Sequence, residues 1–344
     1  YQLARCVQEA GEYGEAEALL RRALEIEEAK LGPDDVQVAV TLYELAQCVR
    51  EAGKYGEAEA LLRRALEIKE AKLGPDDVQV AVTLQELAQC VREAGKYGEA
   101  EALFRRALEI KEAKLGPDDV QVAVTLYELA RCVREAGKYG EAEALLRRAL
   151  EIEEAKLGPD DVQVAVTLQE LAQCVWEAGK YGEAEALFRR ALEIQEAKLG
   201  PDDVQVAVTL QELARCVREA GRYGEAEALL RRALEIEEAK LGPDDVQVAV
   251  TLYELALCVR EAGKYGEAEA LLRRALEIEE AKLGPDDVQV AYTLYELALC
   301  VREAGKYGEA EALLRQALEN EEAELGPTWI PCEKSVKPEV RLSY

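Results

Sequence analysis

The sequence repeats itself every 42 residues, and this period constrains the fold more than any other feature. Self-similarity at such a period is typical of small units that stack around one continuous core. The tetrapeptide Gly-Pro-Asp-Asp marks the period at Gly32, Gly74, Gly116, Gly158, Gly200, Gly242 and Gly284. It divides the chain into a partial repeat at 1–32, seven full repeats and a non-repeating tail at 327–344 that we predict to be a linker or disordered segment. The full repeats are 33–74, 75–116, 117–158, 159–200, 201–242, 243–284 and 285–326.

Each repeat is predicted to form two helices, because its apolar residues recur in two runs with helical spacing. In residues 33–74 the runs are Val38, Leu42, Leu45, Ala46 and Val49, then Ala58, Leu61, Leu62, Ala65 and Ile68. We expect Asp34 to cap the first helix, with Gln37 completing a capping box. Gly53 should end that helix in a left-handed conformation, and Gly74 with Pro75 should end the second. Neither helix can bury its apolar face alone, so the repeats must stack.

This two-helix unit resembles the tetratricopeptide repeat, in the 42-residue form found in kinesin light chains. The positions that carry the resemblance are Leu42, Leu45, Ala46, Val49, Gly53, Lys54, Tyr55, Ala58, Leu62 and Ala65. Two of them depart from the shorter form of the repeat, where Leu42 is Trp and Ala46 is Gly. The resemblance covers residues 1–326. It implies an all-α, right-handed solenoid of tandem helix-turn-helix repeats, whose first helices line a concave groove that binds a protein or peptide.

Comparing the repeats with one another shows that four positions vary along one face of the first helix. We name them after residues 33–74 as the Val40, Tyr43, Gln47 and Arg50 positions, which are three, four and three residues apart. Ligand contact would diversify such a face, whereas drift should also change exposed positions such as Glu44 and Glu59, which are constant. We therefore predict a peptide-binding groove. It comprises Tyr43, Gln47, Arg50, Gln85, Gln89, Arg92, Tyr127, Arg131, Arg134, Gln169, Gln173, Trp176, Gln211, Arg215, Arg218, Tyr253, Leu257, Arg260, Tyr292, Tyr295, Leu299 and Arg302.

The second helix varies at two positions. The Leu62 position becomes Phe104 and Phe188, which indicates adjustment of the core. The Lys69 position becomes Glu153 and Gln195, among others, and we predict that it lies on a solvated face.

The arginines at the Arg50 position allow two interpretations. As ligand-binding groups they would offer planar guanidinium groups to carboxylates, and the partner would be a peptide carrying acidic and aromatic residues. As structural groups they would pair with glutamates at the Glu44 or Glu51 positions of neighbouring repeats. The sequence leaves both open.

Catalysis and metal binding find little support in the sequence. There is no histidine, the only serines are Ser335 and Ser343, and no phosphate-binding glycine motif occurs. Cysteines at one position of each first helix are too far apart for a ladder of disulfides, so we expect buried thiols and no cofactor or metal. The cysteines at this position are Cys6, Cys48, Cys90, Cys132, Cys174, Cys216, Cys258 and Cys300. The ninth cysteine, Cys332, lies in the tail. We predict a protein that is not an enzyme.

The charge and hydropathy of the chain limit its partners and its location. A net charge of −27 disfavours nucleic acid and anionic membrane surfaces. No apolar run approaches the roughly 20 residues of a membrane span. We expect a cytoplasmic protein-interaction scaffold. The alternatives are the ligand-sensing repeats of a larger nucleotide-binding switch ATPase and a structural or engineered consensus array. Without a polar capping helix at either end, self-association through the solenoid ends is a further expectation.

Overall fold

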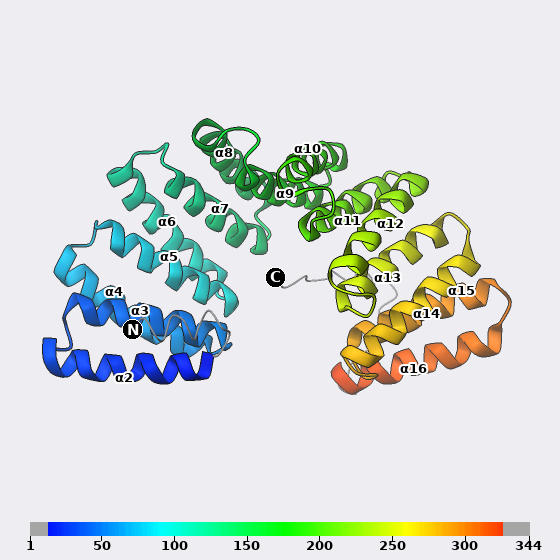
Figure 1. Ribbon diagram of the computed structural model, residues 1–344, viewed down its shortest axis with the longest axis horizontal. Coiled ribbons are helices and arrows are strands. Elements are labelled where there is room, and N and C mark those ends of the chain that lie inside the picture. Colours follow the sequence, from blue (N-terminus) through cyan, green and yellow to red (C-terminus); the bar gives the residue numbers. More distant parts are fainter. Residues whose placement is uncertain (1–12, 326–344) are drawn as a thin grey trace. The chain divides into compact units, whose positions relative to one another are not determined.

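The computed structural model describes the backbone of residues 13–325, and every regular element in that range is an α-helix. The predicted all-α fold of tandem helix-turn-helix repeats is thereby confirmed (Figure 1). The helices are α2 (Tyr13–Leu31), α3 (Val36–Glu51), α4 (Tyr55–Leu73), α5 (Val78–Glu93), α6 (Tyr97–Leu115), α7 (Val120–Glu135), α8 (Tyr139–Leu157), α9 (Val162–Glu177), α10 (Tyr181–Leu199), α11 (Val204–Glu219), α12 (Tyr223–Lys240), α13 (Val246–Glu261), α14 (Tyr265–Lys282), α15 (Val288–Glu303) and α16 (Tyr307–Leu325).

The chain divides into two compact units, Tyr1–Ile194 and Gln195–Tyr344, and the division falls within α10. Each unit is built in the same way. The odd-numbered helices are the first helices of the repeats and the even-numbered helices are the second. In the first unit α5 packs against α4 and α6, and in the second α13 packs against α12 and α14. The predicted first helix of the partial repeat lies outside the described residues, as does the tail.

The core of each repeat lies between its own two helices and the second helix of the repeat before it. In the repeat 75–116, Val80 and Leu84 pack with Ile110 of the same repeat and with Leu66 of the preceding one. The same cluster recurs in the repeats that begin at residues 33, 117, 159 and 243. The residues predicted to form the core of residues 33–74 are buried, with Leu61 half-buried at the edge. Stacking therefore completes each core, as the repeat pattern requires.

The ends of the first helices confirm one expectation and correct another. Gly53 has a φ of 75°, and its N–H donates to Arg50 while that of Lys54 donates to Val49, which is the expected left-handed ending. The predicted cap at Asp34 is wrong by one residue. Asp35 is the cap, because its carboxylate accepts from the backbone N–H of Gln37 at 2.8 Å. Asp35 has the extended backbone typical of a capping residue, which aims its side chain at the exposed N–H groups.

Candidate peptide-binding face

The first helices line one side of each unit, which we call the first-helix face. Successive first helices contact each other directly, α5 with α7 and α7 with α9 in the first unit, and α11 with α13 and α13 with α15 in the second. The four variable positions lie on these helices. The structure thus brings the predicted groove residues of each unit onto one side, although it does not leave all of them accessible.

The Tyr43 position contributes to a buried polar layer between repeats. We define this layer as three residues: the Tyr43 and Lys69 positions of one repeat and the threonine of the next. In the first full repeat, Lys69 donates to Thr83 at 2.8 Å and its ammonium group lies 5.0 Å from the centre of the Tyr43 ring. Lys69 is 5% exposed and Thr83 is fully buried. The prediction that the Lys69 position is solvated is therefore wrong.

The same layer recurs with different residues in the repeats 75–116 and 201–242. Gln211 donates to Glu237 at 2.9 Å and also to the Thr251 hydroxyl, and Thr251 in turn donates to Glu237. The three side chains thus form a closed triangle of hydrogen bonds. The Lys69 position is buried in the next five repeats as well, as Lys111, Glu153, Gln195, Glu237 and Glu279. Variation at the Tyr43 and Lys69 positions is thus linked by contact. One feature of the sequence could have indicated this buried layer, namely the threonine that falls among the apolar positions of every first helix.

Burial shifts the pKa values of the charged groups in this layer. Loss of hydration raises the pKa of Glu237 to about 7, against the opposing hydrogen bond from Thr251. It raises the pKa values of Glu153 and Glu279 to about 7 as well. Desolvation lowers the pKa of Lys111 to about 8. Each such repeat therefore places a group that titrates near neutral pH at the interface with its neighbour.

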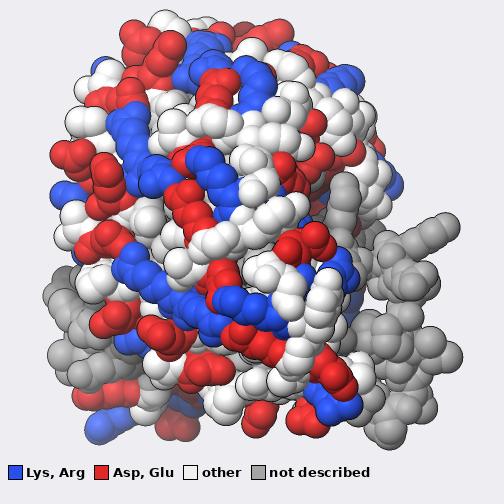
Figure 2. All heavy atoms as spheres, turned by 90° about the vertical axis from the view of Figure 1, so that its right-hand side faces the viewer, with Lys and Arg blue, Asp and Glu red and all other residues white. Residues whose placement is uncertain are grey.

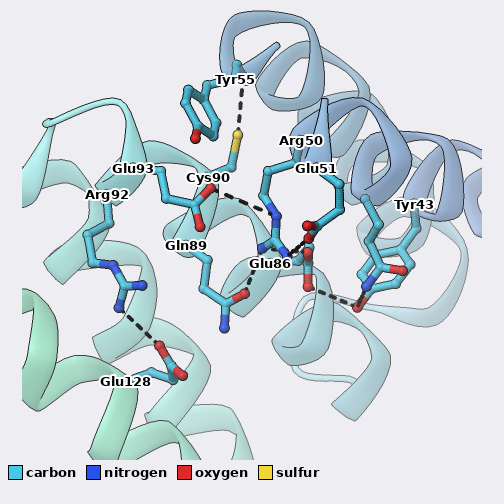
Figure 3. A network of polar contacts seen from close by, with 11 residues as sticks. Tyr43, Arg50, Glu51, Tyr55, Glu86, Gln89, Cys90, Arg92, Glu93 and Glu128 are labelled. Carbon is cyan, nitrogen blue, oxygen red and sulfur yellow. Dashed lines mark hydrogen bonds and ion pairs between the residues drawn. The ribbon is translucent and has the colours of Figure 1, made fainter. Parts of the chain in front are cut away.

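The Arg50 position forms a ladder of ion pairs between repeats, shown in Figure 3 for the first two rungs. Arg50 binds Glu86 of the next repeat at 2.9 Å and donates to Gln89 at 2.8 Å. Arg92 continues the ladder to Glu128 at 3.1 Å. Further along, Arg134, Arg218 and Arg260 bind Glu170, Glu254 and Glu296. Of the two interpretations of these arginines, the structural pairing is the one observed.

The ladder is partly buried, and burial strengthens the attraction between its arginines and glutamates. Burial lowers the pKa of Arg134, but the carboxylates of Glu170 and Glu177 at 2.8 and 2.7 Å outweigh that effect and raise it. For Glu296, burial raises the pKa in spite of the neighbouring Arg260. The guanidinium groups are already neutralised by glutamates of the same chain. They do not form a continuous positive track along the face.

Two places depart from the regular ladder. Trp176 replaces the arginine in the repeat 159–200, and its ring lies edge-on to Tyr181 with centroids 6.0 Å apart. One repeat earlier, on α7, Arg131 lies over the Tyr127 ring at 6.0 Å, and its Nε is 4.0 Å from Glu170. The side chain of Arg131 is 35% exposed, compared with 18% for Arg134. Arg131 is therefore a more accessible cation than the ladder arginine on the same helix.

The predicted groove residues differ in how much solvent they meet. Arg92 (9% exposed), Gln211 (5%) and Tyr253 (9%) are buried, so a ligand cannot reach most of their surface. Tyr295 and Arg302 are exposed. The remaining ones are half-buried: Tyr43, Gln47, Arg50, Gln85, Gln89, Tyr127, Arg131, Arg134, Gln169, Gln173, Trp176, Arg215, Arg218, Leu257, Arg260, Tyr292 and Leu299. The Gln47 position is half-buried in every full repeat, and its residues contact both groups: Gln47 donates to the Tyr43 hydroxyl at 3.2 Å, and Gln89 accepts from Arg50 at 2.8 Å.

The second helices carry another set of ion pairs between repeats, and these explain why several exposed positions do not vary. Arg63 binds Glu59 one turn away and Glu99 of the next repeat, while Lys96 binds back to Glu59 at 2.9 Å. On the face drawn in Figure 2, basic and acidic side chains alternate in short runs and do not gather by sign. Constancy at the Glu44 position of the seven full repeats, and at the Glu59 position, thus reflects pairing. It does not measure how far exposed residues drift.

None of the cysteines between residues 13 and 325 forms a disulfide, as expected for their spacing. All seven are buried. The Cys90 thiol donates to the backbone carbonyl of Tyr55 in the preceding repeat at 3.2 Å. Burial raises the pKa of Cys90 to about 11, which keeps its sulfur protonated and unreactive. In this range we also find no group of three or more potential metal-ligating side chains and no helix long and apolar enough to span a membrane.

A family model for the tetratricopeptide repeat matches the chain in seven overlapping segments. They are residues 1–71, 57–113, 78–155, 121–197, 163–239, 205–281 and 247–323. The chain belongs to the tetratricopeptide repeat family. No curated protein matched its sequence.

Solved tetratricopeptide structures resemble this one. A putative kinesin light chain with nearly identical repeats from Podosopora anserina is 25% identical, with a TM-score of 0.54 over 60% of this chain and 97% of the other. BtubC from P. vanneervenii is 23% identical, with a TM-score of 0.59 over 67% and 92%. The signal transduction ATPase PH0952 from Pyrococcus horikoshii, which has a tetratricopeptide repeat sensor, is 16% identical. Its TM-score is 0.67 over 90% of this chain and 48% of that protein.

Proposed function

We propose that this protein is a non-catalytic scaffold whose first-helix face binds an extended segment of a partner protein. Membership of the tetratricopeptide repeat family supports a protein-binding role. The observation that carries the assignment to this face is the Gln47 position. It is occupied by Gln47, Gln89, Arg131, Gln173, Arg215, Leu257 and Leu299, all of them half-buried. It varies among glutamine, arginine and leucine and supplies no ladder arginine, although Gln47 bonds to Tyr43 and Gln89 to Arg50.

At this position the glutamines lie in the first unit and the leucines in the second, and each unit has one arginine among the described residues. The first unit presents Gln47, Gln89 and Gln173, whose amides suit the backbone of an extended peptide, together with the guanidinium of Arg131. The second unit presents Arg215, Leu257 and Leu299, and Tyr292 and Tyr295 occupy other variable positions of the same face on α15. A partner segment matching the first unit is polar with an acidic residue, and one matching the second is apolar or aromatic.

The acidic-aromatic peptide remains the proposed ligand, but its anchor moves. The ladder arginines are held by Glu86, Glu128 and their equivalents, so a ligand carboxylate would have to displace them. Arg131 is more exposed, and its nearest carboxylate atom is 4.0 Å away. We place the acidic residue of the peptide at Arg131. Because that site is half-exposed, its contribution should weaken as added salt screens the charges.

A site-specific photo-crosslinker tests where the partner binds. A benzophenone amino acid at Gln89 or Gln173 should crosslink one partner from the source cell through one contiguous segment. The same group at Arg63 or Arg147, on the second helices, is the matched control and should not capture that partner. Capture of the same partner only from Arg63 or Arg147 would place the binding surface on the second helices and contradict the proposal.

A second candidate is the sensing domain of a switch ATPase. The similarity to the repeat sensor of PH0952 supports it at the level of fold, and this chain spans 48% of that protein. The reading frame that precedes residue 1 in the genome distinguishes the two. A phosphate-binding loop within an ATPase domain there would favour the sensor, and its absence would favour the independent scaffold.

We further propose that the protein works in the cytoplasm. Seven buried cysteines without disulfides suit a reducing compartment. Non-reducing mass spectrometry of the protein isolated from its source cell should find these thiols unbridged. Disulfides between successive repeats would contradict this placement.

A further inference from the structure

The outer face of α16, at the C-terminal end of the second unit, exposes apolar residues more than the equivalent helix α14 does. Leu314 is 36% exposed and Leu318 is 41% exposed, whereas Leu272, equivalent to Leu314, is fully buried on α14. Tyr307 is 72% exposed, compared with 38% for Tyr265. Together with Arg302, Ala310, Glu311 and Arg315 they line a hollow of 340 Å³. We call this surface the α16 end face.

The repeats themselves show what kind of element covers such a face. On α14, the covering element is the first helix α15, whose Val290 and Leu294 pack with Leu276, the equivalent of Leu318. The end of a first helix reaches the start of the preceding second helix as well, where Cys258 donates to the carbonyl of Tyr223 at 3.1 Å. An amphipathic helix lying along the face is therefore the shape that fits it.

The charges on the α16 end face define the polar side of that helix. Arg260 binds Glu296 of the following repeat, whereas Arg302, 52% exposed, pairs with Glu303 of its own helix at 3.2 Å. Likewise Arg273 binds Glu309 of the following repeat, whereas Arg315, 73% exposed, pairs with Glu311 one turn away. Arg302 and Arg315 thus occupy the positions at which arginines of the preceding repeat bind carboxylates of the repeat after it.

We propose that the α16 end face binds an amphipathic helix of another protein, which carries an apolar face for Tyr307, Leu314 and Leu318 and a carboxylate for Arg302. A second copy of this chain fits less well. In residues 1–9 of such a copy, Gln2 stands where the ladder has glutamate, so this segment would offer Arg302 no carboxylate at that position. Residues 327–344 include Pro331 and Pro338 and do not repeat the first-helix pattern. A partner helix is therefore the occupant that the charges favour. A partner helix bound at the α16 end face would leave the first-helix face free to bind its own ligand.

A peptide taken from the chain supplies the probe. A fluorescent synthetic peptide of residues 243–262 contains Glu254 and Glu261, the two carboxylates that lie near the ladder arginine Arg218 of the preceding repeat. It should bind the full chain saturably in fluorescence anisotropy. Leu314→Asp together with Leu318→Asp should abolish binding, because both side chains lie under the helix. Leu241→Asp, at a leucine 39% exposed elsewhere on the second unit, is the matched control and should bind as the parent does.

A charge exchange separates specific docking from a general loss of stability. Arg302→Glu should weaken binding at least about tenfold, because a bound carboxylate then meets a like charge. A peptide with Glu254→Arg and Glu261→Arg should bind this variant better than the parent peptide does. The proposal is wrong if the parent peptide does not bind, or if Arg302→Glu leaves its affinity unchanged. Sedimentation showing that the chain associates with itself through this face, with loss of association in the leucine variant, would assign it to a second copy.

Discussion

At the scale of single residues, the buried glutamates of the polar layer make stability depend on pH. The folded protein raises the pKa of Glu237 to about 7 from 4.5, so it holds a proton over a pH range in which the unfolded chain has lost it. The unfolding free energy therefore falls as pH rises from about 4.5 to 7 and changes no further above that. The chain offers a neutral reference at the same position, because Gln195 accepts from Thr209 in the equivalent layer.

We predict that Glu237→Gln stabilises the protein at pH 8 but not near pH 4.5. The gain at pH 8 should be about 2–3 kcal/mol, the free energy of ionising a carboxyl whose pKa is raised by burial. Denaturant unfolding at the two pH values measures it. Glu235→Gln, on an exposed residue of the same helix, should change neither value by more than a few tenths of a kcal/mol. An equal gain at both pH values for Glu237→Gln would contradict the account.

The cap at the start of each first helix gives a second test at this scale. Asp77→Ala should cost about 1 kcal/mol of unfolding free energy, because Asp77 accepts from the N–H of Gln79 at 2.8 Å. Asp76→Ala removes the same charge from the adjacent residue and should cost less. If the two substitutions cost the same, charge near the helix end and not the hydrogen bond is what stabilises the helix.

At the scale of elements, the arginine ladder joins each first helix to the next. Arg92→Glu should destabilise the protein by about 1–3 kcal/mol, because Glu128 and Glu135 are then left beside a third carboxylate in a partly buried site. Adding Glu128→Arg should restore much of the loss by re-forming the pair in reverse. Unfolding of the two single variants and the double variant measures the coupling. Costs that simply add would mean that the two residues do not interact.

Much of this element structure follows from the sequence alone. The helices, their core faces and the glycine endings could be predicted because local propensity and the 42-residue period agree. The cap at Asp35 could not be separated from Asp34, since the choice depends on backbone angles that two adjacent aspartates do not reveal. The Lys69 position looked solvated because lysine and glutamate usually are. Only the packing of one repeat on the next shows that its partners are Tyr43 and a buried threonine.

At the scale of the whole molecule, two kinds of variation have different causes. Changes at the Tyr43 and Lys69 positions are exchanges within the buried layer, whereas the Gln47 position varies at the accessible surface. The arginine and glutamate ladders repeat a similar interface along each unit, except where Trp176 replaces the arginine. A repeat protein of this kind separates stacking from recognition, and the two should respond to different substitutions. The candidate face could be located from the sequence, but its accessible residues could not be told apart from the buried ones.

The most direct test permutes the Gln47 position using only residues that the chain already has there. The changes are Gln47→Leu, Gln89→Leu, Arg131→Leu, Gln173→Leu, Leu257→Gln and Leu299→Gln. The matched control exchanges core residues at the Leu62 position, through Phe104→Leu and Leu146→Phe, which lie at 0% exposure. Partner capture from the source cell and denaturant unfolding are measured for both proteins. We predict that the permuted protein loses its partner and keeps its unfolding midpoint, while the control keeps the partner. If the permuted protein captures the same partner as before, recognition does not reside on the first-helix face.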